Sequence, residues 1–175
     1  MNNTLSNLTV IVLTYKTDLE ILKNCIKSID TTVNINLIEN SVELKDKKKI
    51  KDLNPNINFF CTGENLGYGM GNNFGLKNTK TRYALILNPD VVCAPDFFKN
   101  ILKYTNEQID FTIIGAQYND NSQWKPFGYF EENKKKPNPS SDDLDLIEAD
   151  WVIGCSMLID LNKFENKNIF DKNYF

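Results

Sequence analysis

The chain has 175 residues, 41% hydrophobic and 25% charged, with a formal net charge of −3; this suits one globular domain over residues 1–175 and gives no positive field for nucleic acid. The absence of histidine excludes Ser-His and Cys-His catalysis, and four scattered cysteines without a Cys-x-x-Cys pair exclude a zinc site. No apolar stretch approaches the roughly 20 residues of a membrane span and the polar start resembles no signal peptide, so we expect a soluble cytoplasmic protein with reduced, mostly buried thiols.

The first part of the chain predicts strands alternating with helices. Residues 8–14 are a nearly unbroken apolar and β-branched run, which is typical of a strand buried on both faces of a sheet. Asp18 can cap a following helix, in which leucine and isoleucine recur at helical spacing as far as Ile29. A second strand is expected over residues 34–40 and a third over residues 57–61, with an exposed charged helix over residues 43–52 between them.

A glycine-dense stretch over residues 63–75 predicts a loop that leads into a helix ending near Thr79. Such a loop can bring backbone amides close to an anion at a helix N-terminus. It can equally be a tight turn that lets a helix pack closely on the sheet, and both interpretations stay open. The stretch matches neither common phosphate-binding fingerprint, because Asn72 stands where a dinucleotide site has its last glycine.

The second half of the chain predicts a helix, further strands and one irregular region. Strands are expected over residues 82–87 and 111–116, a helix over residues 96–104, and a further ordered apolar run over residues 151–159. Residues 119–147 are rich in Asn, Asp, Ser, Lys and Pro and are predicted to form a mobile loop. Strands and helices alternating at this spacing predict an α/β fold with a Rossmann-like, mainly parallel sheet and helices on both faces.

Polar residues follow three predicted strands, at the edge where a parallel sheet binds ligands. They are Thr14-Tyr15-Lys16, Glu39-Asn40-Ser41 and Asn88-Pro89-Asp90. A carboxylate such as Asp90 suits Mg²⁺ or Mn²⁺, because the phosphates of a substrate supply other ligands. The alternatives without a ligand are that the last tripeptide is a plain turn and that Glu39 is a solvated strand end. Trp124 and Trp151 could stack on sugar rings, although a tryptophan beside an apolar run more often belongs to the core.

Taken together and in this order, four segments resemble the inverting family 2 of glycosyltransferases, which have the GT-A fold. The segments are VIVLTY (residues 10–15), LIENS (37–41), NLGYGMGNNFG (65–75) and LILNPD (85–90). The third resembles most specifically the rhamnosyltransferase-like subgroup, and in the fourth Asn88 replaces the first acid of a D-x-D motif. Residues 151–159 resemble the acceptor-side segment of the same family.

The resemblance implies transfer of a sugar, with inversion, from a dTDP-rhamnose-like donor or a UDP-sugar to a glycan or lipid-linked acceptor in polysaccharide biosynthesis. It implies nucleotide contacts by Thr14, Tyr15, Glu39, Asn65, Gly67, Asn72 and Asn88. It further implies a divalent metal, Mg²⁺ or Mn²⁺, held by Asp90 under the diphosphate. A lipid-linked acceptor is compatible with peripheral association at the inner face of the membrane.

In this family a Glu-Asp pair supplies the base that deprotonates the acceptor, and the matching position lies beyond Phe175. The chain is therefore expected to be truncated before its catalytic base, with Asp150 and Asp171 as weaker candidates. A sugar transferase, inactive or active as this fragment, is the first hypothesis, and a non-catalytic nucleotide-sugar-binding or scaffold protein is the second. A nucleotidyltransferase would want a glycine-rich, basic loop after the first strand, which residues 14–18 lack.

Overall fold

The computed structural model describes residues 5–106, 110–116, 119–120, 123–124, 127–128 and 149–174. The loop predicted over residues 119–147 lies largely outside these ranges. None of the described helices is both long enough and apolar enough to span a bilayer.

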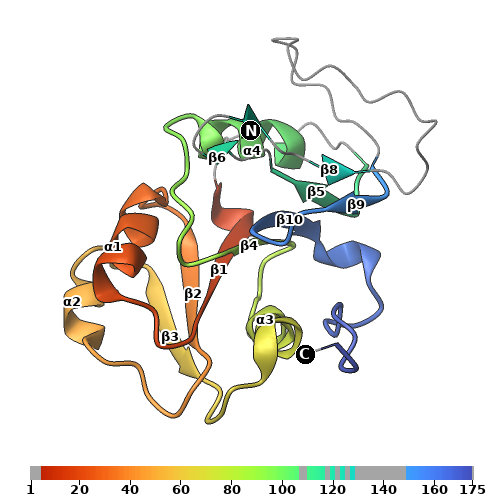
Figure 1. Ribbon diagram of the computed structural model, residues 1–175. Coiled ribbons are helices and arrows are strands. Elements are labelled where there is room, and N and C mark those ends of the chain that lie inside the picture. Colours follow the sequence, from red (N-terminus) through yellow and green to blue (C-terminus); the bar gives the residue numbers. More distant parts are fainter. Residues whose placement is uncertain are drawn as a thin grey trace.

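A six-stranded sheet with the order β3-β2-β1-β4-β10-β5 lies at the centre of the molecule (Figure 1). Its strands are β1 (Leu8–Thr14), β2 (Asn34–Glu39), β3 (Ile57–Cys61), β4 (Tyr83–Leu87), β5 (Ile113–Gly115) and β10 (Ser156–Asp160). The first four pair in parallel, whereas β10 runs antiparallel to both of its neighbours, β4 and β5. The prediction of a mainly parallel α/β sheet is confirmed.

Short elements complete the described chain. Two small ladders pair β6 (Asn119–Asp120) with β7 (Gln123–Trp124) and β8 (Phe127–Gly128) with β9 (Trp151–Val152). The helices are α1 (Leu19–Ser28), α2 (Lys47–Lys51), α3 (Gly67–Lys77) and α4 (Phe97–Asn106), with single 3-10 turns at Leu5–Asn7 and Leu161–Lys163.

Helices cover both faces of the sheet, as predicted. Buried side chains of α1, α2 and α4 share one core cluster with alternate residues of the strands. On the other face, Leu76 and Phe74 of α3 pack with strand residues and with the C-terminal segment around Phe170. On β1, Val10 faces the first cluster and Ile11 the second, and neither is accessible to solvent. Burial on both faces explains why this strand reads as an unbroken apolar run.

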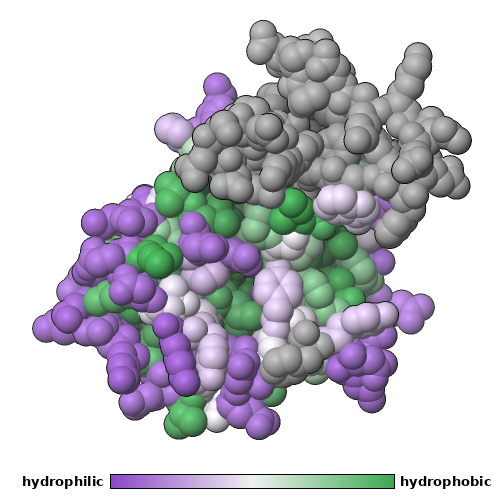
Figure 2. Space-filling model, in the orientation of Figure 1, coloured by the Kyte–Doolittle hydropathy of each residue, from purple (hydrophilic) through white to green (hydrophobic). Residues whose placement is uncertain are grey.

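Several predicted boundaries move. Asp18 does cap α1, accepting hydrogen bonds from the amides of Glu20 (2.8 Å) and Ile21 (3.3 Å), but Ile29 is the residue after the helix and not a member of it. The charged helix expected over residues 43–52 is limited to α2, preceded by Asp46 in a left-handed conformation. Its lysines are exposed, and Figure 2 shows this side of the molecule as mostly hydrophilic.

The glycine-dense stretch is not the predicted loop, because most of its glycines lie inside α3. A Cβ atom on Gly71 would lie 2.7 Å from a methyl carbon of Leu13, and one on Gly75 would lie 2.5 Å from Ile11 Cγ2. These glycines therefore let the helix backbone approach β1 more closely than any other residue would. Of the two interpretations left open by the sequence, close helix packing is confirmed for this pair.

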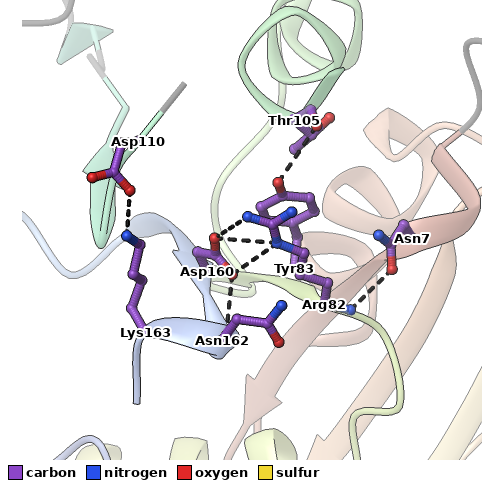
Figure 3. Close-up of polar contacts among 8 residues, drawn as sticks. All are labelled: Asn7, Arg82, Tyr83, Thr105, Asp110, Asp160, Asn162 and Lys163. Atoms are coloured by element: carbon purple, nitrogen blue, oxygen red, sulfur yellow. Dashed lines mark hydrogen bonds and ion pairs between the residues drawn. The ribbon is translucent and has the colours of Figure 1, made fainter. Parts of the chain in front are cut away.

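An ion pair joins the start of β4 to the end of β10, away from the carboxyl ends of the parallel strands (Figure 3). The Arg82 guanidinium donates to both carboxylate oxygens of Asp160, with its shortest contact, Nη2 to Oδ2, at 2.6 Å. The carboxyl group of Asp160 is only 1% exposed and also accepts the Asn162 amide. Hydrogen bonding from Arg82 holds the pKa of Asp160 below its usual value.

Candidate functional site

The strand order places a topological switch point between β1 and β4. From β1 the chain moves outward through β2 to β3, and then it returns to the opposite side of β1 to form β4. Ligands of open α/β sheets bind beyond the carboxyl ends of the strands at such a point. Thr14 ends β1 and Asn88 follows β4, so the predicted site residues of these two strands flank the switch point.

Glu39 ends β2 and is held beside the end of β1. Its carboxylate accepts a hydrogen bond from the Thr14 hydroxyl (2.8 Å) on one oxygen and from the Ser41 hydroxyl (2.6 Å) on the other. Glu39 is only 4% exposed and Thr14 only 1%, so the interpretation of Glu39 as a solvated strand end is wrong. A carboxylate fixed in this way keeps further lone pairs with which to accept hydrogen bonds from a ligand.

The residue after Glu39 anchors the approach to α3. The Asn40 side chain donates to Asn65 Oδ1 (2.9 Å) and accepts the amide of Leu66 (3.0 Å). Asn65 Oδ1 in turn accepts the amide of Gly67 (3.0 Å), whose φ of 74° lies in the left-handed region that favours glycine. Two predicted nucleotide contacts, Asn65 and Gly67, therefore lie beside the end of β2. Asn40, which holds them there, had been noted only as one of the polar residues after the second strand, without a role of its own.

Asn72 is placed differently from the other predicted nucleotide contacts. It lies within α3, has no exposed surface, and its side-chain nitrogen donates to the backbone oxygen of Tyr68 (3.0 Å). Its side-chain oxygen has no hydrogen-bond partner among the residues described. Its role at the nucleotide stays a prediction.

The chain turns sharply where it leaves β1. Tyr15 is exposed, and Lys16 adopts a left-handed conformation with φ 53°. The ammonium nitrogen of Lys16 lies 5.1 Å from the centroid of the Tyr15 ring, within range of a cation–π contact. An aromatic ring and a positive charge thus stand together at the carboxyl edge.

The tripeptide Asn88-Pro89-Asp90 is a turn, because the Val91 amide bonds back to the Asn88 carbonyl (3.2 Å). The turn also has a partner across the sheet, since the Asn88 amide donates to the Cys155 carbonyl (2.9 Å) in the connection from β9 to β10. The expected continuous strand over residues 151–159 is interrupted there by residues 153–155. This connection therefore reaches the candidate site.

Asp90 presents an exposed carboxylate at this edge, and no described side chain or amide bonds to it. Nowhere in the described ranges do three His, Cys, Asp or Glu side chains form a metal-binding group. Within the described ranges, a metal at Asp90 would thus have fewer than three such protein ligands and would need oxygen ligands from a substrate. This arrangement fits Mg²⁺ or Mn²⁺, which commonly take one or two carboxylates together with phosphate oxygens.

Besides burial, the negative charge of Asp90 contributes to the raised pKa of two cysteine thiols, Cys25 and Cys155. Burial raises the pKa of the Cys25 thiol to about 12, with smaller contributions from Cys93 and Asp90, and burial followed by Asp90 raises that of Cys155. All four cysteines are free thiols; Cys25 and Cys93 are buried, whereas Cys61 and Cys155 are only partly buried.

Tyr68, in the first turn of α3, lies against the same β9–β10 connection. Its hydroxyl donates to the Gly154 carbonyl, and its ring packs edge to face on Phe170 with centroids 5.8 Å apart. Burial raises the pKa of this hydroxyl to about 12. Trp151, for which a place in the core was the more common of two open interpretations, is instead 43% exposed on β9.

The two weaker candidates for a base lie outside this group of strand ends. Asp171 is exposed near the end of the chain, where its carboxylate accepts the amide (2.9 Å) and the side-chain nitrogen (2.8 Å) of Asn173. Asp150 is exposed directly before β9. A role in proton transfer stays a prediction for both.

The sequence profile of the family described as "Glycosyl transferase family 2" matches residues 9–166, which is most of the chain. The chain belongs to this family. No curated protein matches it significantly by sequence.

Solved structures that are similar to this chain include two of TarS and one of a mannosyltransferase. The S. aureus TarS 1–349 structure has a TM-score of 0.57 and 17% identity over 71% of this chain and 40% of that one. The same protein in complex with UDP-GlcNAc gives 0.56 and 17%, over 71% and 38%. The mannosyltransferase PcManGT from Pyrobaculum calidifontis, solved with GDP-Man and Mn²⁺, gives 0.49 and 18%, over 63% and 35%. The chain thus spans less than half the length of the structures it matches, and the TarS likeness supports the GT-A-like fold.

Proposed function

We propose that this chain is the donor-binding part of a glycosyltransferase that takes its sugar from a nucleoside diphosphate sugar. The observation that carries the proposal is the buried Glu39 carboxylate, fixed by Thr14 and Ser41, at the same sheet edge as the exposed carboxylate of Asp90. One carboxylate is fixed to accept hydrogen bonds, and the other is open to a cation. A nucleoside joined to a diphosphate offers groups for both.

The nucleoside belongs at β1 and β2 in this proposal. Glu39 accepts hydrogen bonds from ribose hydroxyls or a base N–H, and the exposed ring of Tyr15 offers a face for the base. Lys16 contributes a positive charge beside them. Asn65 and Gly67 line the same end of β2. TarS has been solved with UDP-GlcNAc, and we propose a uridine or thymidine diphosphate sugar, including a rhamnose donor, for this chain.

The diphosphate belongs at the turn after β4. Asp90 would hold Mg²⁺ or Mn²⁺, with the diphosphate supplying further oxygen ligands and Asn88 lying beside it. The cation would neutralise negative charge on the departing nucleoside diphosphate. Held at this edge, the donor would expose its anomeric carbon to a glycan or lipid-linked acceptor, and a single displacement would invert its configuration. The rhamnosyltransferase-like assignment, a role in polysaccharide biosynthesis and a cytoplasmic site at the membrane face are part of this proposal.

Calorimetric titration with UDP-, dTDP- and GDP-sugars, with and without Mn²⁺, tests the donor site. We expect metal-dependent binding by the wild type and, for Asp90→Asn, an affinity at least about tenfold lower in the presence of Mn²⁺. Asp52→Asn, an exposed carboxylate beside α2, is the matched control and should bind as the wild type does. Because Asp90 is exposed and makes no described contact, its variant should keep the wild-type melting temperature.

Absence of binding to every nucleotide sugar would overturn the proposal. Binding with an unchanged metal dependence in Asp90→Asn would overturn the metal assignment alone. A donor hydrolysis and transfer assay on the bound donor then separates a transferase from a protein that binds the donor without turnover.

A further inference from the structure

The Tyr68 ring is fixed at two points and is still partly open to solvent. Its hydroxyl donates to the Gly154 carbonyl, and Phe170 packs against it at an interplanar angle of 86°. Gly154 permits this contact, since a Cβ atom there would lie 3.0 Å from the Tyr68 hydroxyl oxygen. Despite these contacts, Tyr68 remains 38% exposed. A large aromatic side chain is thus held in one orientation without being part of the core.

The ring stands beside the proposed donor site. Asn40, which follows Glu39, donates to the carbonyl of Gly67, the residue before Tyr68, at 3.1 Å. On the other side, the connection that receives the Tyr68 hydroxyl also receives the Asn88 amide, one residue further along at Cys155. Tyr68 is therefore linked through one hydrogen bond and a neighbouring residue to the end of β2, and likewise to the turn that carries Asp90.

The ring, and not the hydroxyl, is the part of Tyr68 available to a ligand. The hydroxyl proton is engaged by the Gly154 carbonyl, and burial raises the pKa of the hydroxyl still further above neutral pH. Proton transfer by this group is disfavoured for both reasons. What the residue offers is a partly exposed aromatic ring at the border between the strand ends and the β9–β10 connection.

We propose that the face of the Tyr68 ring is a stacking surface for the pyranose ring of a sugar that occupies the site. Sugars present an apolar C–H face that an aromatic ring can cover, and an orientation fixed before binding reduces the entropy lost on binding. The pyranose can come from the donor or from the acceptor, because Tyr68 contacts the connection before β10, which also bonds to the diphosphate turn. The inference rests on the proposed function and adds a specificity-determining residue to it.

The test compares sugar-bearing and sugar-free ligands. Wild type, Tyr68→Phe and Tyr68→Leu are titrated with UDP-GlcNAc, dTDP-rhamnose and GDP-mannose and with UDP, dTDP and GDP, all with Mn²⁺. Free GlcNAc, rhamnose and mannose are examined by saturation-transfer NMR in the presence of the nucleoside diphosphate that binds. Ile21→Ala, at an exposed apolar residue of α1 on the other face of the sheet, is the control.

For a stacked donor sugar, Tyr68→Leu should weaken the nucleotide sugar by about three- to tenfold while leaving the nucleoside diphosphate unchanged. For a stacked acceptor sugar, both affinities should stay and the saturation transfer to the free sugar should disappear. Tyr68→Phe keeps the ring without its hydrogen bond and should retain most of either effect.

Two results would overturn the inference. If Tyr68→Leu changes neither readout, or weakens the nucleoside diphosphate as much as its sugar derivative, then stacking on a pyranose is wrong while the donor site stands. If no nucleoside diphosphate binds the wild type, the proposed function fails, and this inference fails with it.

Discussion

The Thr14 hydroxyl donates a hydrogen bond to the Glu39 carboxylate across the ends of two adjacent parallel strands. The two residues are the last pair in the register of β1 and β2, so the contact joins the carboxyl ends of these strands. It also gives a buried charge one of its two hydroxyl partners. Local stability and the geometry of the proposed nucleoside site therefore depend on the same bond.

Replacing Thr14 by valine tests this dependence. Thr14→Val keeps the shape of the side chain but leaves a buried carboxylate with only the Ser41 hydroxyl, so the free energy of unfolding should fall by about 1–3 kcal/mol. Thr14→Ser retains a hydroxyl and should lose less. Urea denaturation at pH 7 measures both, and equal losses in the two variants would show that the hydroxyl is not what matters.

Gly75→Ala should destabilise the protein although alanine is the better helix former. The new Cβ atom would lie 2.5 Å from Ile11 Cγ2 and 3.2 Å from Ile38 Cγ1, so α3 would have to move away from the sheet. Overpacking of this kind costs about 1–3 kcal/mol, more than the helix propensity returns. Lys77→Ala, in the last turn of the same helix, is exposed and should be neutral. A stabilised Gly75→Ala would show that helix and sheet can separate freely.

The Arg82–Asp160 pair predicts an acid-dependent loss of stability. The pKa of Asp160 is lowered from the usual 3.8, so its contribution is present above that value and is lost as the pH falls through the lower folded-state pKa. Arg82→Met should lower the free energy of unfolding by about 1–2 kcal/mol at pH 7, since Arg82 is itself partly exposed. The difference from wild type should shrink below about pH 4.

Urea denaturation of both proteins at pH 7 and pH 3 measures this difference. Lys163→Ala removes the exposed ion pair with Asp110 and serves as the control, with an expected change within about 0.5 kcal/mol. A difference between wild type and Arg82→Met that is the same at both pH values would contradict the role assigned to Asp160.

Thiol modification should separate the four cysteines. Burial raises the pKa of Cys25 to about 12 and that of Cys93 to about 11, so at pH 8 neither forms the thiolate that reacts. We expect a disulfide reagent to modify only Cys61 and Cys155 in the folded protein and all four in urea. Because Cys155 bonds to Asn88, a bound nucleotide sugar should slow its modification but not that of Cys61. Fast labelling of Cys25 would contradict the packing of α1.

Strand β1 was predictable because both of its faces are buried and its end is marked by polar residues, and residues 8–14 coincide with it. Residues 57–61 coincide with β3, although only Ile57 of that strand is buried. Thr14 and Glu39 could be placed at one edge from the parallel order alone. Their mutual hydrogen bond could not, since it depends on the register between two strands that brings together residues 25 positions apart in the sequence.

The glycine stretch could not be predicted from local preference. Glycine disfavours helix, which led to a loop over residues 63–75, but contact with Leu13 and Ile11 favours glycine where α3 meets β1. The interruption at Gly154 and the antiparallel direction of β10 depend on contacts with Tyr68 and β4 that are remote in sequence. The position of the Tyr68 ring beside the site could not be predicted for the same reason.

The position of β10 inside the sheet also bears on how the chain is made. Among the described strands, β10 is the neighbour that covers the free side of β4 and the partner to which β5 bonds. During synthesis, β1 to β4 leave the ribosome before β10 does. One edge of the buried, apolar strand β4 therefore stays unpaired until Asp160 has emerged. Such edges recruit other chains. Nascent chains arrested between Leu87 and Asp160 should accordingly be the ones that bind a chaperone, and those arrested after the 3-10 turn Leu161–Lys163 should be released.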